Sequence, residues 1–463
     1  MLLHPDRLLP ADLGTRSIAR MLYEQVRSLP IVSPHGHTRA AWFAANEPFP
    51  DPAQLLVQPD HYILRMLYSQ GISLDDLEIG QPAPTDARKV WRTFAAHYYL
   101  FRGTPTRLWL DFAFRELFAL EPPLCEDTAD LYFDAISEKL RTPAFLPRAL
   151  YQRFNLEVLA TTDSPLDSLS DHQAIRDSNW KARILPTFRP DPVVDPEYEG
   201  FDKNIARLGE MTTNDTGTWF GYLNALRANR QRFLKLGCTA TDHGHPTAAT
   251  ANLSPADAAE LYHRVLAGKA DPAQQELFRA QMLTEMARMS LEDGLVMQLH
   301  VGSARNHNRK LYERYGRDMG ADIPQPTNYV NALRPLLEQF GNERGLTIIL
   351  FTLDESTYSR ELAPLAGHYP CLRLGPPWWF HDCPEGMMRF RQRVTETAGF
   401  YNTVGFNDDT RAFLSIPGRH DVARRMDCSF LANLVAEHRL REDEAVEVAR
   451  DLAYGLVKKA YRL

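Results

Sequence analysis

Two patterns of apolar and polar residues alternate along this chain of 463 residues. Short runs rich in β-branched residues predict strands, and longer stretches in which apolar residues recur every three or four positions predict helices. Their alternation favours a parallel sheet whose strands are joined by crossover helices. We expect eight strands: Ile31–His37, Val158–Asp163, Ile184–Asp191, Cys238–Asp242, Leu295–Val301, Thr347–Leu353, Cys371–Gly375 and Thr403–Asp408.

Most of these runs begin with apolar residues and end with polar ones. The fourth ends at Asp242, the fifth carries His300 near its end, and Asp409 and Arg411 follow the eighth. Eight strands with polar carboxyl ends predict a distorted (β/α)8 TIM-type barrel, where the active site gathers at that end. An open doubly wound sheet is the competing architecture, and the lack of GxGxxG after the first run disfavours its dinucleotide-binding version.

The first two predicted strands are separated by far more residues than one crossover helix requires. Apolar and aromatic residues within this gap, including Val90, Phe94 and Phe101, recur at helical spacing. We therefore expect a helical insertion between strands 1 and 2. The predicted organisation is an amino-terminal helix with the first strand (residues 1–40), the helical insertion (41–153), and the rest of the barrel with carboxyl-terminal helices (154–463).

Composition narrows the class of protein. A hydrophobic content of 44% supplies a large core, and a net charge of −7 without a basic tail argues against a nucleic-acid partner. No run of eighteen apolar residues occurs, so we expect no membrane partner. The five cysteines are scattered and never spaced as CxxC, which is typical of reduced thiols in a cytoplasmic protein. The sequence leaves open whether the chain forms a homo-oligomer.

The first predicted strand ends in a histidine pair, His35 and His37, which flank Gly36. Alternate residues of a strand share one face, so both imidazoles can approach a single point, and neutral imidazole is a preferred ligand of zinc and similar ions. The alternative is that both histidines only form hydrogen bonds within the fold. A second pair, His243 and His245, falls in a predicted loop, and we do not expect it to bind metal.

Eight short segments in a fixed order resemble one known family. They are HGH at 35–37, QPDHYILRM at 58–66, TTDSPLDSL at 161–169, LPTFRPD at 185–191, GCTATDH at 237–243, LHVGSARNHN at 299–308, GPPWWF at 375–380 and DDTRAFLS at 408–415. Over nearly its whole length the chain is similar to the uronate isomerases, a branch of the amidohydrolase superfamily. The family often has cysteine at the position of Gly36, where the side chain points away from the metal, so we expect little effect.

The resemblance implies one divalent metal ion, usually zinc, held by His35, His37 and Asp409. Three protein ligands leave coordination positions open for water or substrate, as in catalytic metal sites. His300 is expected either to ligate the ion weakly or to contact the substrate. Dinuclear amidohydrolases usually carry a bridging lysine at the end of strand four, where this chain has Asp242, so we expect a single ion.

The resemblance also implies a reaction, the aldose–ketose isomerisation of hexuronates. D-glucuronate would give D-fructuronate, and D-galacturonate would give D-tagaturonate, through an enediolate. This chemistry needs a base and an acid at C2 and C1. The resemblance suggests Asp409, or a metal-bound water beside it, for the C2 proton, and Tyr62 to donate to or accept from the sugar oxygens, with Arg411 beside them. Arg189 and Arg411 can bind the sugar-acid oxygens. The full set of expected substrate-binding residues is His61, Arg189, Asp242, His300, Arg305 and Trp379.

Two other functions remain open at this point. A mononuclear metal-dependent hydrolase could use the same barrel, because a fold does not determine its chemistry. A non-catalytic protein that binds sugar acids is the other. Arg189, Arg411 and Tyr62 favour the isomerase, and the concentration of histidine, aspartate and arginine at strand ends argues against a purely structural barrel.

Overall fold

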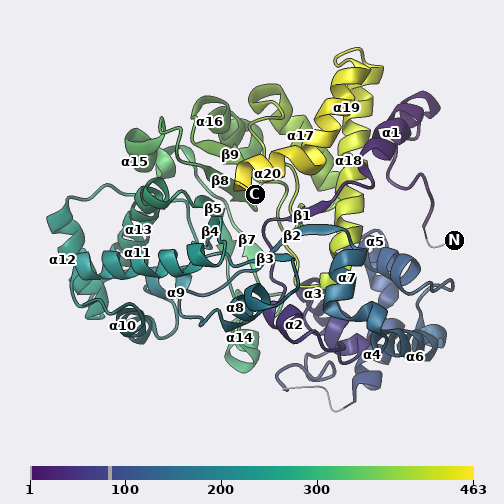
Figure 1. Cartoon of the computed structure of the whole chain (residues 1–463), viewed down its shortest axis with the longest axis horizontal. Helices are drawn as coiled ribbons and strands as arrows, with labels where there is room; N and C mark the ends of the chain where they lie inside the picture. Colours follow the sequence, from purple (N-terminus) through teal and green to yellow (C-terminus); the bar gives the residue numbers. More distant parts are fainter. Residues whose placement is uncertain (1–2, 82–85) are drawn as a thin grey trace.

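The computed structural model describes residues 3–81 and 86–463 and shows an α/β fold in which helices surround two parallel sheets (Figure 1). The first sheet has the order β1-β2-β3, and the second has the order β4-β5-β8-β9. Every pairing within these two sheets is parallel. The strands are β1 (Ile31–Ser33), β2 (Leu156–Ala160), β3 (Arg183–Leu185), β4 (Ala240–His243), β5 (Val296–Val301), β8 (Ile348–Thr352) and β9 (Leu372–Leu374).

Isolated bridges connect the two sheets, so the strand order follows the sequence throughout. Phe188, beyond the end of β3, bridges both to Asp163 and to Thr241 of β4. The Phe188 amide donates to the Ala240 carbonyl at 3.2 Å. Parallel neighbours in sequence order are what the alternation of predicted strands and helices requires.

The eighth predicted strand, Thr403–Asp408, does not form. Only Thr403 makes a parallel bridge, to Leu374, and two residues later Gly405 has φ of +77°, which interrupts an extended backbone. Strand pairing among the described residues therefore closes no barrel. The α/β class with parallel sheets is confirmed, and the other seven predicted strands are present but shorter than predicted.

The described part of the chain between β1 and β2 contains helices joined by loops and no strand. Side chains of Asp60, Asp86 and Thr104 cap the amino-terminal ends of three of these helices. Its buried aromatic residues share one core with residues of the first sheet, such as Leu156 and Ile184. The helices are α2 (Ala40–Ala45), α3 (His61–Ser69), α4 (Ala87–Ala96), α5 (Pro105–Phe112), α6 (Ala129–Leu140) and α7 (Pro147–Arg153). Residues 82–85 of the predicted insertion lie outside the described residues.

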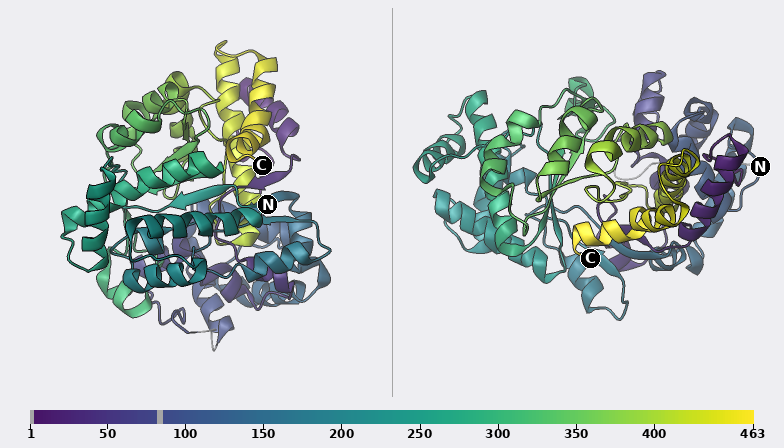
Figure 2. Two further views of the ribbon diagram at one scale, coloured as in Figure 1. Left: turned by 60° about the vertical axis from the view of Figure 1, so that its left-hand side comes forward. Right: turned by 90° about the horizontal axis from the view of Figure 1, so that it is seen from above.

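Most of the remaining helices pack around the second sheet, and those at the two ends of the chain pack against each other. The amino-terminal helix α1 lies beside the carboxyl-terminal helices α18 and α19 (Figure 2). None of the helices in the described residues is long and apolar enough to cross a membrane. They are α1 (Leu13–Val26), α8 (Ser170–Asp177), α9 (Asp191–Val194), α10 (Phe201–Thr212), α11 (Trp219–Lys235), α12 (Pro255–Leu266), α13 (Pro272–Asp293), α15 (Val330–Phe340), α16 (Ala363–His368), α17 (Pro384–Ala398), α18 (Ile416–Ala436), α19 (Glu442–Arg450) and α20 (Leu456–Tyr461).

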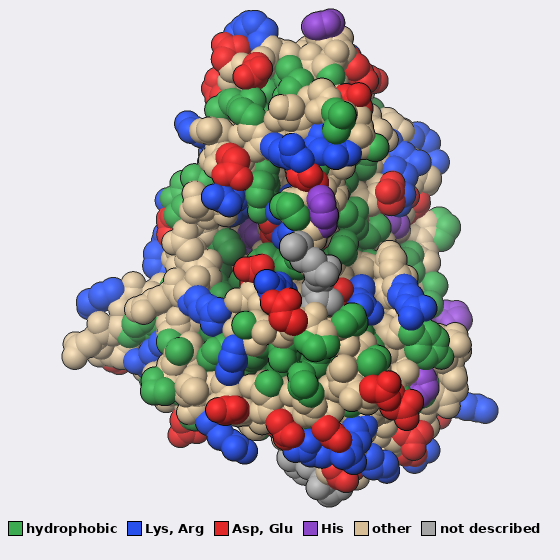
Figure 3. Space-filling model, turned by 90° about the vertical axis from the view of Figure 1, so that its right-hand side faces the viewer, with side chains coloured by type: hydrophobic (Ala, Val, Ile, Leu, Met, Phe, Trp, Pro, Cys, Tyr) green, Lys and Arg blue, Asp and Glu red, His purple; other side chains and the backbone are tan. Residues whose placement is uncertain are grey.

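A small antiparallel ribbon after β5 was not predicted. It pairs β6 (Ser303–Ala304) with β7 (Ile323–Pro324) and encloses a loop that carries α14 (Arg309–Tyr315). Strands of two residues are too short to show a sequence period, which is why the pattern missed them. We call residues 305–322 the ribbon loop. On the face shown in Figure 3, basic and acidic side chains are interspersed, and neither kind forms a continuous surface.

Candidate active site

A cavity of about 390 Å³ lies at the carboxyl ends of the strands. Its wall is contributed by segments that are far apart in the sequence, including the ends of β1, β2 and β5, the ribbon loop and the chain that follows residue 403. The carboxyl edge of parallel strands is where this type of fold places its ligands. Of the eleven predicted site residues, nine line it: His35, His37, His61, Arg189, His300, Arg305, Trp379, Asp409 and Arg411.

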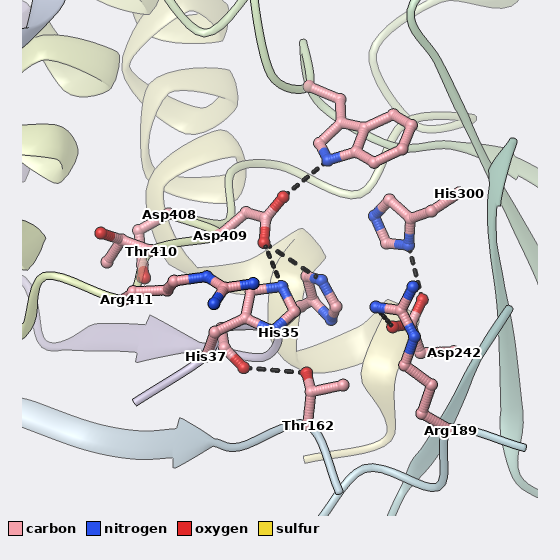
Figure 4. A network of polar contacts seen from close by, with 12 residues as sticks. His35, His37, Thr162, Arg189, Asp242, His300, Asp408, Asp409, Thr410 and Arg411 are labelled. Atoms are coloured by element: carbon pink, nitrogen blue, oxygen red, sulfur yellow. Dashed lines mark hydrogen bonds and ion pairs between the residues drawn. The ribbon is translucent and has the colours of Figure 1, made fainter. Parts of the chain in front are cut away.

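Three potential metal ligands converge on one side of the cavity (Figure 4). The Asp409 Oδ1 atom lies 3.3 Å from His35 Nε2 and 3.0 Å from His37 Nε2. Neither contact has hydrogen-bond geometry, because Asp409 Oδ1 has no hydrogen-bond partner among the described residues. Three lone-pair atoms that converge without bonding to one another fit a site for a divalent ion.

The two histidines lie on a different element from the one predicted. Strand β1 ends at Ser33, so His35 and His37 lie in the loop and not on alternate positions of a strand. Pro34 has no amide hydrogen for the parallel ladder, which limits the pairing there. The Gly36 position is roomy as expected, since an added Cβ would meet no atom closer than 3.5 Å.

The pKa values of the three potential ligands shift in different directions. Burial by itself would raise the pKa of Asp409, but the neighbouring His35 and His37 hold that pKa well below its ordinary value. Burial lowers the pKa of His37, whereas the charges of Asp242 and Asp409 overcome the effect of burial and raise the pKa of His35. Trp378 Nε1 donates to the other carboxylate oxygen of Asp409 at 2.6 Å and fixes its orientation.

His300 belongs to a second cluster next to the first. Its Nδ1 atom contacts Asp242 Oδ1 at 2.7 Å, and its ring stacks on His35 with centroids 4.5 Å apart. Burial lowers the pKa of His300 to about 4, so the ring is neutral and donates from Nδ1 to the carboxylate. The buried Nε2 atom, which has no partner among the described residues, then carries a lone pair toward a metal ion or a substrate hydroxyl.

Arg189 makes a second metal ion beside Asp242 unfavourable. Its Nη1 atom donates to Asp242 Oδ2 at 3.0 Å, and its Nε atom donates to Asp191 Oδ2 at 2.8 Å. A guanidinium charge at that distance already neutralises the carboxylate that a second cation would need. Asp242 itself does not line the cavity, which corrects its predicted contact with substrate; it orients Arg189 and His300 instead.

The His243–Gly244–His245 segment packs against Arg189. A Cβ at Gly244 would lie 2.2 Å from Arg189 Nη2, so only glycine allows the guanidinium this close. His243 Nε2 contacts Thr241 Oγ1 at 2.9 Å. The groups of potential ligands in the described part of the chain do not include this histidine pair.

The ribbon loop contributes to the cavity wall, and two predicted site residues form ion pairs with its aspartates, Arg411 from outside the loop and Arg305 from within it. Arg411 contacts Asp318 at 3.0 Å, and Arg305 contacts Asp322 at 3.2 Å. Both aspartates lie on the ribbon loop and line the cavity. No sequence pattern predicted these two aspartates. Asp318 pairs with Arg411, which is distant along the chain, and Asp322 pairs with Arg305 across a loop that was not predicted.

Tyr62 lies just behind the residues that line the cavity, and its predicted role toward the substrate stays a prediction. It is 7% exposed, and its hydroxyl donates to Asp382 Oδ2 at 2.7 Å. The preceding residue, His61, lines the cavity and contacts Trp379 with ring centroids 4.5 Å apart. Burial, with the charge of Arg411, lowers the pKa of His61 to about 3, so this imidazole is neutral.

Asp163 is a cavity residue that the predicted site omitted. Its Oδ2 atom accepts from Thr161 Oγ1 at 2.6 Å, and Thr161 Oγ1 also contacts His172 Nε2 at 2.8 Å. Burial raises the pKa of Asp163 to about 7. The signal was present in the sequence, because Asp163 is the polar end of the second predicted strand.

Parallel strands that carry a histidine–aspartate cluster at their carboxyl ends, over a polar cavity, define an α/β enzyme with a candidate metal centre. The sequence model described as glucuronate isomerase matches residues 11–461. The chain therefore belongs to the glucuronate isomerase family, and it is an isomerase. A uronate isomerase of Phenylobacterium zucineum is 63% identical, and the alignment covers 100% of this chain and 97% of that relative.

Two crystal structures of relatives support the same membership. The glucuronate isomerase of Caulobacter crescentus is 59% identical with a TM-score of 0.98, and the match covers 99% of this chain and 97% of that one. A uronate isomerase of Thermotoga maritima is 28% identical with a TM-score of 0.93 over 100% of both chains. The family resemblance seen in the eight sequence segments is thus confirmed over the whole chain.

Proposed function

We propose that the protein interconverts D-glucuronate with D-fructuronate and D-galacturonate with D-tagaturonate. The observation that carries this proposal is the convergence of His35, His37 and Asp409 in a cavity that also holds arginine side chains. The family membership gives the reaction class, and the arginines provide the positive charge that a sugar acid requires.

His35, His37 and Asp409 would hold one divalent ion, and we propose zinc. When bound, such an ion supplies Lewis acidity that polarises the oxygens at C1 and C2 of the sugar. Asp409 is the proposed base for the C2 proton, since its low pKa keeps the carboxylate ionised at neutral pH. The proton returns at C1, so that an enediolate lies between aldose and ketose.

The remaining cavity residues are proposed to bind the sugar acid. His300 Nε2 accepts a hydrogen bond from a hydroxyl group if it does not ligate the ion. Arg189 and Arg411 contact the carboxylate or hydroxyl oxygens, with His61, Arg305 and Trp379 on the surrounding wall. Tyr62 lies just behind this wall, and we propose that its hydroxyl donates a proton to, or accepts one from, the oxygens at C1 and C2 of the sugar.

We also propose that the chain forms a distorted (β/α)8 barrel with a helical insertion at residues 41–153. Two observations support the barrel. The strand order follows the sequence, and one hydrogen bond connects the segments where the first and eighth predicted strands would pair. The His37 amide donates to the Thr410 carbonyl at 3.0 Å, which brings the chain after the eighth predicted strand next to the chain after the first.

Incubation of the purified protein with each hexuronate tests the proposed reaction. We expect part of the aldose to be converted to the corresponding ketose until equilibrium is reached, without any other substrate. Ketose colorimetry or NMR measures this conversion. Glucose, which lacks the carboxylate, is expected to react very slowly. Absence of ketose from both hexuronates, with the metal content verified, would refute the proposal.

A further inference from the structure

A buried ion pair, Asp382 and Arg419, lies next to the cavity wall and has no role in the reaction described above. The two side chains belong to residues that are 8% and 3% exposed. Arg419 Nη1 donates to Asp382 Oδ2 at 3.0 Å. Because the desolvation cost of a buried ion pair often exceeds its attraction, stability alone does not account for such a pair in a core.

One end of the pair holds Tyr62. The oxygen of Asp382 that binds Arg419 also accepts the hydrogen bond from the Tyr62 hydroxyl, at 2.7 Å. The backbone amide of Tyr62 is fixed as well, since it donates to the side chain of Asp60 at the start of α3. The Tyr62 hydroxyl therefore has one defined direction, which Asp382 sets.

The other end of the pair holds the turn that carries Asp409. The same Arg419 Nη1 atom donates to the carbonyl oxygen of Asp408 at 3.2 Å. Asp409 has φ of +39°, a region that is unfavourable for residues other than glycine and persists only when the surroundings hold it. The guanidinium itself is held in place, because it lies 3.5 Å over the ring of Trp109.

We infer that Asp382 and Arg419 are positioning residues that fix the Tyr62 hydroxyl and the Asp409 carboxylate in one relation to each other. The inference rests on the proposed function, in which these two groups handle the protons of the reaction. Neither Asp382 nor Arg419 is among the described residues that line the cavity. They act through Tyr62 and Asp409 and do not contact the substrate.

A double-mutant cycle with Asp382→Asn and Tyr62→Phe tests this inference. Asparagine has nearly the same shape as aspartate but no negative charge, so it accepts weaker hydrogen bonds from Tyr62 and Arg419. We expect Asp382→Asn to lower kcat by about 10-fold or more, with a smaller change in KM, as supporting partners of a site commonly do. In the Tyr62→Phe background the same change should lower kcat by clearly less than in the unmodified enzyme, because only its effect through Arg419 on the Asp409 turn remains.

The matched control is Asp427→Asn, which breaks a comparable Arg–Asp pair between α17 and α18, away from the cavity. Arg391 Nε lies 2.7 Å from Asp427 Oδ1. This variant should lower the melting temperature and leave kcat unchanged. A kcat loss as large as that of Asp382→Asn would mean that breaking any buried pair harms the reaction, and would overturn the inference.

Two further outcomes decide between the inference and the proposed function. If the unmodified enzyme converts neither hexuronate, the proposed function fails. If it is active and Asp382→Asn costs the same in both backgrounds, or nothing, only the positioning role fails. Should Asp382→Asn not fold, Arg419→Lys is measured in the same cycle; it keeps the charge but cannot donate to both oxygens in the same geometry, and the same coupling with Tyr62→Phe is expected.

Discussion

At the scale of single residues, the candidate metal site depends on a few atoms held without mutual hydrogen bonds. Asp409 Oδ1 lies 3.0–3.3 Å from the Nε2 atoms of His35 and His37, while Trp378 donates to the other carboxylate oxygen of Asp409. An imidazole and a carboxylate that are brought together in this way gain most from a cation placed between them. The predictions at this scale therefore concern ligands, the proposed base and one unusual carboxyl group.

The first prediction concerns metal content. The purified protein should contain about one divalent ion per chain, and His35→Asn should lower this content because one ligand is lost. His245→Asn is the control, since His245 is buried beside the site without belonging to a ligand group. Elemental analysis measures both. An equal loss of metal from the two variants would contradict the ligand assignment.

The second prediction concerns the proposed base. Asp409→Asn is nearly isosteric and should preserve the fold while lowering kcat by about 100-fold or more, because both a base and a ligand are lost. Steady-state kinetics and circular dichroism provide the two measurements. Substrate deuterated at C2 should also lose label to water during turnover. Near-normal turnover by Asp409→Asn would remove this residue from both roles.

The third prediction concerns Asp163, whose pKa burial raises to about 7. Because the folded state favours the protonated form, its contribution to stability is complete below about pH 4 and is lost as pH rises through 7. Each pH unit in this interval costs at most about 1.4 kcal/mol. Asp163→Asn cannot titrate, so its melting temperature relative to the unmodified protein should rise between pH 4 and pH 7. A difference that stays constant with pH would argue against the raised pKa.

At the scale of elements, the ribbon between β6 and β7 shapes the cavity more than any predicted strand does. The ribbon loop is attached through the Asp318–Arg411 contact and through Asp75, which contacts Arg314 and Tyr315, while Arg305 and Asp322 join the two ends of the loop to each other. Asp318 has φ of +67°, so its ion pair holds a backbone conformation that is unfavourable for aspartate. The loop thus depends on side chains from other parts of the chain for its position.

The fourth prediction follows from that attachment. Asp318→Asn removes the charge that Arg411 contacts and should increase the mobility of the ribbon loop. Hydrogen exchange of amides in residues 305–322 should accelerate, and KM for the hexuronate should rise by a few-fold. Asp443→Asn is the control, because Asp443 contacts Arg441 at the exposed surface, outside the ribbon loop. Unchanged exchange in Asp318→Asn would show that the loop is held by other contacts.

At the scale of the whole molecule, the two ends of the chain are joined and the site draws on segments throughout it. The helix α1 packs on α18 and α19 (Figure 2), and α18 supplies Arg419. Residues of the cavity wall range from His35 to Arg411. A ligand that binds these segments together stabilises the folded state, because the unfolded chain cannot bring them together.

The fifth prediction uses this linkage. Removal of the metal by exhaustive chelation should lower the melting temperature of the purified protein, and addition of zinc should restore it. Free zinc at one hundred times its dissociation constant stabilises by about 2.7 kcal/mol. His35→Asn should show a much smaller shift. A melting temperature that is independent of chelation and zinc would contradict a metal site shared between the ends of the chain.

Patterns among neighbouring residues determined most of the strands and helices of this protein and many residues of its cavity. The periods of apolar residues predicted seven of the eight parallel strands at the correct places and the helices that follow β1, because strand and helix periods arise from neighbours in the sequence. Polar residues at strand ends, together with the family resemblance, predicted nine residues that line the cavity. The eighth strand failed because Gly405, at positive φ, carries no periodic signal.

Only the tertiary structure decided which distant residues meet. Tyr62 meets Asp382 and Arg419, Arg411 meets Asp318, and the choice of glycine at position 244 becomes intelligible only beside Arg189. Such pairings depend on how helices and loops pack in three dimensions, and no sequence spacing encodes them. The sequence therefore predicted the candidate metal-binding and substrate-binding residues, whereas only the packing revealed the residues that hold them in position.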